Sequence, residues 1–96
     1  MDRLLIVEGQ AKGAAFPLKD EEVTIGRARE CTLRLAETDV SKLHARIHRQ
    51  NGDWILTDAG SRNGIVVNGE KRSSHPLKDG DKFTINAQIG EALVTN

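Results

Sequence analysis

Positively charged, hydroxyl and amide side chains gather in three short segments of this chain. The segments are Gly26-Arg27, Ser41-Lys42-Leu43-His44 and Gly60-Ser61-Arg62-Asn63-Gly64. Each lies between stretches typical of strands, and loops at one end of a β-sandwich are common binding sites. If the segments converge, their cations and donors would bind an anion of phosphate size, because a phosphorylated side chain carries about −1.5 to −2 charges and three acceptor oxygens. The alternative is that these loop cations are solvated and that residues 60–64 form a plain turn.

Catalytic and metal-binding patterns are weak in this sequence. It has no Gly-x-Ser-x-Gly, Walker-type Gly-Lys-Ser/Thr, Gly-x-Gly-x-x-Gly or Cys-x-x-Cys motif. On a strand, Ser41 and His44 would project to opposite faces, with no acid to orient the imidazole. His44 and His48 would share the outward face with Arg46, about 13 Å apart at roughly 3.3 Å per residue. We therefore expect no enzyme activity, no metal site and no cofactor.

The segments that must position these residues are predicted to be short strands. Nine Gly and two Pro are spread along the chain, and the Asn-Gly pairs at 51–52 and 68–69 indicate hairpins, because both residue types tolerate positive φ. Strands are expected at 3–8, 14–18, 23–26, 32–35, 45–49, 54–58, 65–67, 70–72, 82–85 and 92–95. Nine to eleven short strands in 96 residues are typical of a β-sandwich. Residues 39–49 have a helical alternative, capped by Asp39, with Val40, Leu43 and Ile47 on one face.

Composition excludes several classes of partner. The chain has 96 residues, enough for one domain, and 14 Lys+Arg balance 14 Asp+Glu. Without a net charge, no whole-molecule field would attract it to nucleic acid or to an acidic membrane. Its single cysteine, Cys31, permits no internal disulfide, and the apolar run Leu4–Val7 is too short for a signal peptide or a membrane span. The expected compartment is the cytoplasm.

Five motifs make the chain resemble the forkhead-associated (FHA) domains, which bind phosphothreonine peptides. They are Gly26-Arg27, Ser41-Lys42-Leu43-His44-Ala45 in the family's Ser-x-x-His pattern, Asp58-Ala59-Gly60-Ser61-Arg62-Asn63-Gly64, Val67-Asn68-Gly69 and Leu77-Lys78-Asp79-Gly80-Asp81. They occur in the family's order and spacing within residues 3–95. The resemblance implies an all-β fold: an eleven-stranded β-sandwich of two mainly antiparallel sheets, FHA/SMAD-like, with the binding loops at one end. It favours a strand over a helix in residues 39–49.

The resemblance also implies roles for individual residues. Arg27 and Ser41 match the principal phosphate ligands, and Lys42 matches a position that is often basic and contacts the phosphate. Asn63 matches an asparagine that binds the peptide backbone, and Arg62 lies where relatives carry a phosphate-contacting threonine. The positions expected to form the framework of the site are Gly26, His44, Gly64, Asn68 and Gly69. His44 is expected to hold the binding loop in place.

The function implied is that of a non-catalytic signalling adaptor. Residues 1–96 would form a single FHA domain, complete or part of a longer protein, and would be a monomer. Its partner would be a Thr-phosphorylated protein or peptide, such as a Ser/Thr kinase or its substrate, rather than nucleic acid or membrane. One alternative is a degenerate FHA scaffold for phosphate-independent interaction or oligomerisation. Another is a metal-dependent hydrolase that uses His44, His48 and nearby acids.

Overall fold

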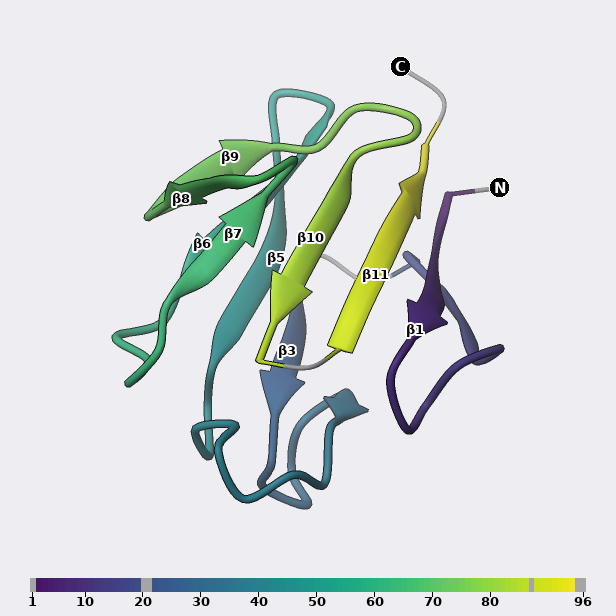
Figure 1. Ribbon diagram of the computed structural model, residues 1–96. Helices are drawn as coiled ribbons and strands as arrows, with labels where there is room; N and C mark the ends of the chain where they lie inside the picture. Colours follow the sequence, from purple (N-terminus) through teal and green to yellow (C-terminus); the bar gives the residue numbers. More distant parts are fainter. Residues whose placement is uncertain (1, 20–21, 87, 95–96) are drawn as a thin grey trace.

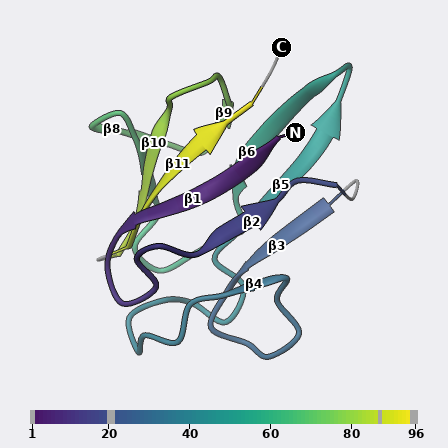
Figure 2. The ribbon, with the colours of Figure 1, turned by 90° about the vertical axis from the view of Figure 1, so that its right-hand side faces the viewer.

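The computed structural model of this chain describes residues 2–19, 22–86 and 88–94, and these residues form an all-β fold. Eleven strands make two sheets (Figures 1 and 2), as the resemblance implied. None of the described residues belongs to a helix long and apolar enough to cross a membrane.

The two sheets have six and five strands. The larger has the order β2-β1-β11-β10-β7-β8, and the smaller β4-β3-β5-β6-β9. Strands of the larger sheet are β1 (Arg3–Glu8), β2 (Ala15–Pro17), β7 (Ile65–Val67), β8 (Glu70–Arg72), β10 (Lys82–Ile85) and β11 (Gln88–Leu93). Strands of the smaller sheet are β3 (Glu22–Gly26), β4 (Leu33–Arg34), β5 (Ala45–Gln50), β6 (Asp53–Asp58) and β9 (Ser74–Pro76). Among the pairings of the described residues only β3 with β4 is parallel, so the prediction of mainly antiparallel sheets is confirmed.

Alternating side chains from both sheets form one hydrophobic core. In β5, for example, Ala45 and Ile47 are buried whereas Arg46 between them is exposed. Trp54 of β6 is the largest buried side chain, and its indole N–H donates to the Asp2 carboxylate at 2.9 Å. This bond satisfies the donor of the buried indole and joins β6 of the smaller sheet to the residue before β1 of the larger sheet.

Both Asn-Gly hairpins are confirmed. Asn51 and Gly52 have φ values of 53° and 86°, and they join β5 to β6 with Gln50 paired to Asp53. Asn68 and Gly69 have φ values of 50° and 84° between β7 and β8. Positive φ at both central residues defines a turn whose twist matches the flanking strands.

Other predictions of secondary structure need correction. The helical alternative for residues 39–49 is wrong, because β5 begins at Ala45 and turns precede it. The last strand begins at Gln88 instead of residue 92; its predicted end at residue 95 lies outside the described residues. Strand β9 was not predicted, because Ser74-His75-Pro76 has no apolar alternation; it pairs with β6 at the edge of the sheet, where proline is tolerated.

Strand directions bring the three cationic segments to one end of the sandwich. β5 runs antiparallel to β3 and β6, so the end of β3, the start of β5 and the end of β6 lie together. The chain between β3 and β5 forms loops at the bottom of Figure 1. Residues 59–64 follow β6 and lead into β7.

Candidate functional site

The segments after β3 and before β5 are hydrogen-bonded to each other along their backbones. The Arg27 N–H donates to the Ser41 carbonyl at 3.0 Å, and the Ala28 N–H donates to the Lys42 carbonyl at 3.1 Å. These bonds extend the β3–β5 contact beyond the strands themselves. The first two predicted segments therefore converge.

Gly26 permits this close approach. A Cβ atom at this position would lie 2.2 Å from the Lys42 carbonyl oxygen, well inside van der Waals contact. No residue with a side chain fits here without displacing the backbone that carries Ser41 and Lys42.

His44 is buried and holds two loops together, so the expectation that it faces outward is wrong. Its exposed fraction is 0%, its Nδ1 accepts the Ser41 backbone N–H at 3.2 Å, and its Nε2 lies 2.8 Å from the Gly64 carbonyl oxygen. Because an N–H can only donate and a carbonyl can only accept, the ring is neutral with the proton on Nε2. His44 precedes β5 and is not constrained by the alternation of that strand.

The third segment is folded on itself by Asp58 and Ser61. The Ser61 hydroxyl donates to the Asp58 carboxylate, and its oxygen accepts the Gly64 N–H at 2.8 Å. The Ser61 N–H also donates to Asp58, at 3.3 Å. Gly60 and Gly64 have φ values of 79° and 77°, which favour glycine. The loop after β6 is thus preorganised.

Arg62 and Asn63 connect this third loop to the second. The Arg62 backbone N–H donates to the Ser41 hydroxyl oxygen at 3.0 Å. The Asn63 side-chain amide donates to the Asp39 carbonyl at 3.0 Å. All three predicted segments therefore converge, with Ser41 at their junction.

Arg27 is oriented toward the second loop by its own side chain. Its Nε donates to the Val40 carbonyl at 3.1 Å, and its terminal guanidinium nitrogens have no partner among the described residues. The Lys42 and Arg62 side chains are exposed, and no described carboxylate forms an ion pair with either. Hydrogen-bond donors and positive charge are therefore available to a ligand at this end of a chain with no net charge.

Arg34 is a further cation that the sequence did not point to. Strand β4 pairs in parallel with β3, so that Arg34 lies opposite Gly26, and its Nε donates to the Arg27 carbonyl at 3.0 Å. The Leu-Arg-Leu alternation of residues 33–35 indicates that Arg34 faces outward, but not which strand lies next to it.

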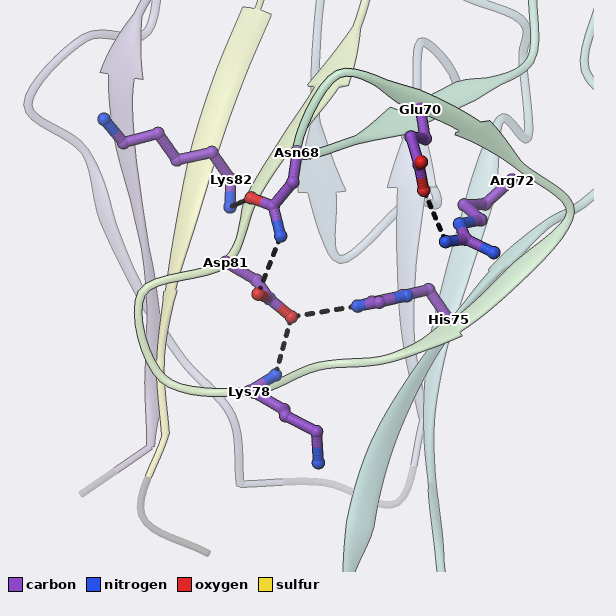
Figure 3. Close-up of polar contacts among 7 residues, drawn as sticks. All are labelled: Asn68, Glu70, Arg72, His75, Lys78, Asp81 and Lys82. Carbon is purple, nitrogen blue, oxygen red and sulfur yellow. Dashed lines mark hydrogen bonds and ion pairs between the residues drawn. The ribbon is translucent and has the colours of Figure 1, made fainter.

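Asn68 and Gly69 are not brought to this site. They form the turn at the far end of β7, where Asn68 donates to the Asp81 carboxylate at 2.9 Å and accepts the Lys82 N–H at 3.0 Å. Asp81 also accepts the Lys78 N–H and lies 2.9 Å from His75 Nε2 (Figure 3). These hydrogen bonds join the Asn68-Gly69 turn to the loop before β10.

The pKa of Asp81 reflects this cluster. Burial raises the pKa of its carboxyl, but hydrogen bonds from Asn68, the Lys78 backbone and His75, together with the charge of His75, lower it by more. The pKa therefore lies below the ordinary value for aspartate, and the carboxylate form stabilises the fold.

The described residues offer no ligand set for the metal-dependent alternative. No three His, Cys, Asp or Glu side chains among residues 2–19, 22–86 and 88–94 are grouped to hold an ion. Both ring nitrogens of His44 already have protein partners, so it has no free nitrogen with which to join His48.

The described residues thus form a two-sheet sandwich with three interlinked loops at one end, where Lys42 and Arg62 have no ion-pair partner among them. The FHA domain family model matches residues 23–86, which contain all three loops, and the chain belongs to this family. FHA domains are non-catalytic interaction modules, which confirms the prediction that the chain is not an enzyme.

Known proteins similar to this chain include regulators and FHA domains of solved structure. The oxoglutarate dehydrogenase inhibitor of Corynebacterium diphtheriae is 39% identical over 82 residues, covering 85% of this chain and 57% of that protein. The chain thus spans little more than half the length of this relative. A structure from an analysis of phosphothreonine-dependent FHA domain interactions has a TM-score of 0.89 and 26% identity, covering 99% of this chain and 97% of the other. Mycobacterium tuberculosis EmbR, in complex with a low-affinity phosphopeptide, has a TM-score of 0.89 and 28% identity, covering 98% of this chain and 24% of EmbR.

Proposed function

We propose that this chain binds phosphothreonine-containing segments of protein partners through the loops that carry Arg27, Ser41 and Arg62. The observation that carries the proposal is the convergence of an ordered guanidinium and a hydroxyl with unpaired cations. Support comes from the FHA relatives whose structures concern phosphothreonine-dependent interactions or contain a phosphopeptide.

Each site residue has a distinct role in this proposal. The free terminal N–H groups of Arg27 and the hydroxyl hydrogen of Ser41 donate to phosphate oxygens. Lys42 and Arg62 add positive charge, with Arg62 also anchored through its backbone. Asn63, held by the Asp39 carbonyl, offers its remaining amide groups to the backbone of the ligand.

Binding is expected to be reversible and of moderate strength. Three or four charge-assisted hydrogen bonds at about 1.5–3 kcal/mol each give a gross ~5–12 kcal/mol. Association and ordering of the peptide cost an amount of the same size. Such an affinity suits an adaptor that responds to phosphorylation.

The proposed setting is a cytoplasmic phosphorylation pathway. The partner is a Thr-phosphorylated protein or peptide, such as a Ser/Thr kinase or its substrate, bound by a monomeric domain. The proposed domain comprises residues 1–96, and its match covers 57% of the Corynebacterium relative. The zero net charge argues against nucleic acid or acidic membrane as the ligand.

Calorimetric titration of one peptide in phosphorylated and unphosphorylated form tests this function. The wild-type chain should bind only the phosphothreonine form, and Arg27→Ala should weaken that binding by at least tenfold. Arg3→Ala, at the exposed start of β1, is the matched control and should retain the affinity. Equal affinity for both peptides in all three proteins would contradict the proposal and favour the phosphate-independent scaffold.

A further inference from the structure

Lys71, on the edge strand β8, extends its side chain to the loop that carries Arg62 and Asn63. Its backbone pairs with Val66, the second residue of β7, but its side chain runs back along β7 to Gly64. A Cβ atom on Gly64 would lie 2.9 Å from Lys71 Cε and 3.6 Å from Lys71 Nζ. Two residues of a strand span about 6.6 Å, so the side chain is extended toward the binding end of the sandwich. Its ammonium group lies beside the residue that follows Asn63.

The ammonium group of Lys71 has no ion-pair partner among the described residues. Both backbone polar groups of Gly64 are already bonded: its N–H donates to the Ser61 hydroxyl oxygen, and its carbonyl lies opposite His44 Nε2, each at 2.8 Å. An ammonium group carries three N–H donors and no acceptor. Lys71 therefore presents hydrogen-bond donors and a positive charge to a ligand.

The neighbouring cation of β8 is paired within its own strand. The Arg72 guanidinium forms an ion pair with the Glu70 carboxylate (Figure 3). Arg72 is thus neutralised locally, whereas Lys71 keeps its charge beside the binding loop.

The third loop relates Lys71 to the proposed ligand. Gly64 follows Asn63, which is proposed to bind the backbone of the ligand, and lies two residues from Arg62, whose N–H is bonded to the Ser41 hydroxyl. An extended peptide advances about 3.3 Å per residue. The Lys71 ammonium is therefore within reach of a ligand side chain that lies within about four residues of the phosphothreonine.

We infer that Lys71 determines specificity by binding the carboxylate of an aspartate or glutamate close to the phosphothreonine. The inference rests on the proposed function, and Lys71 lies outside the five motifs that identify the family. The carboxylate supplies a counter-charge that the described residues do not provide. Because Lys71 is exposed, this ion pair should raise affinity about two- to fivefold over alanine at the same position.

A positional library of phosphothreonine peptides identifies the position of the acidic residue. Wild-type protein should enrich aspartate or glutamate at one position within four residues of the phosphothreonine. Lys71→Met should lose this enrichment, because methionine keeps an unbranched side chain to cover Gly64 but carries no charge. Absence of acidic enrichment in the wild type, or its persistence in Lys71→Met, would overturn the inference. Phosphate-dependent binding without acidic enrichment would leave the proposed function intact, whereas absence of phosphate-dependent binding would reject both.

Charge reversal at Lys71 separates a direct ion pair from a general effect of charge. Calorimetric titration compares phosphothreonine peptides with glutamate, alanine or lysine at the position found. Wild-type protein should bind the glutamate peptide about two- to fivefold more tightly than the alanine peptide. Lys71→Glu should reverse this order and prefer the lysine peptide.

The matched control for charge reversal is Arg72→Glu, which changes the net charge by the same amount on the adjacent residue. It should keep the preference for glutamate, and thermal unfolding verifies that both variants are folded. A wild-type preference in folded Lys71→Glu, or the same reversal in Arg72→Glu, would contradict the inference.

Ionic strength provides an independent readout, because salt screens exposed ion pairs. The Debye length falls from about 10 Å at 0.1 M salt to about 3 Å at 1 M. The ratio of the affinities for the glutamate and alanine peptides should therefore approach one in 1 M salt. A ratio that does not change with salt would assign the preference to packing against the lysine side chain and overturn the inference.

Discussion

The backbone N–H of Arg62 donates to the hydroxyl oxygen of Ser41 at 3.0 Å, and this bond joins the loop after β6 to the loop before β5. A hydroxyl has one hydrogen to donate and two lone pairs to accept with. Since Arg62 uses a lone pair and no described residue accepts the hydrogen, Ser41 can bind Arg62 and a phosphate oxygen at once. Ser41 is therefore both a link between loops and a proposed ligand.

Removal of this hydroxyl should weaken phosphopeptide binding more than it destabilises the domain. Ser41→Ala loses a hydrogen bond to a charged group, worth about 1.5–3 kcal/mol, or roughly 10- to 100-fold in affinity. Ser41→Thr retains the hydroxyl and should restore most of the binding. Calorimetric titration of both variants with one phosphothreonine peptide measures the difference; equal losses in the two would show that the hydroxyl is not a ligand.

His44 should contribute far more to stability than His48. His44→Ala leaves a buried cavity and unpaired groups at Ser41 and Gly64, at a cost of about 2–4 kcal/mol. His48 is only partly buried, on the outer face of β5, and His48→Ala should change the free energy of unfolding by less than about 1 kcal/mol. Urea denaturation, monitored by the fluorescence of Trp54, measures the free energy of unfolding of both variants. A small effect of His44→Ala would mean that its two hydrogen bonds do not support the loops.

Gly26 should tolerate substitution less well than Gly80 because the two are restricted for different reasons. Gly26→Ala places a Cβ against the Lys42 carbonyl, which should shift the Ser41–Lys42 backbone, destabilise the domain by more than about 2 kcal/mol and abolish phosphopeptide binding. Gly80 has open space around it but a φ of 87°, so Gly80→Ala should cost only about 1–2 kcal/mol. Urea denaturation measures the loss of stability in each variant, and titration with a phosphothreonine peptide measures its binding. Similar binding by Gly26→Ala and Gly80→Ala would argue against a tight contact at Gly26.

The Asp81 cluster should make stability fall in acid. Because the pKa of Asp81 is lowered in the folded state, its stabilisation is present above the ordinary aspartate pKa of about 3.9 and is lost as the pH falls through the folded value. Asp81→Asn should lower the free energy of unfolding by about 1–2 kcal/mol at pH 7. This difference from the wild-type protein should become smaller below about pH 4. Urea denaturation between pH 7 and pH 2 tests this. If the difference in unfolding free energy between the two proteins does not change with pH, Asp81 stabilises the fold through packing and not through its charge.

The amino-acid sequence alone determined the local features of this protein. Asn51-Gly52 and Asn68-Gly69 specify their turns because tolerance of positive φ belongs to the residues themselves. Alternation in segments such as Lys82–Ile85 predicts strands because side chains on a strand alternate between its faces. The ordered motifs that contain Arg27 and Ser41 were sufficient to recognise the family.

Only the tertiary structure decided how distant segments meet. Burial of His44 depends on partners on both sides of it, at Ser41 and Gly64, and a strand pattern carries no information about them. Strand β9 exists because β6 offers it an edge, and Arg34 reaches Arg27 only because β4 pairs with β3. Hydrogen bonds and packing between residues far apart in the chain produce these features, and no local propensity encodes them.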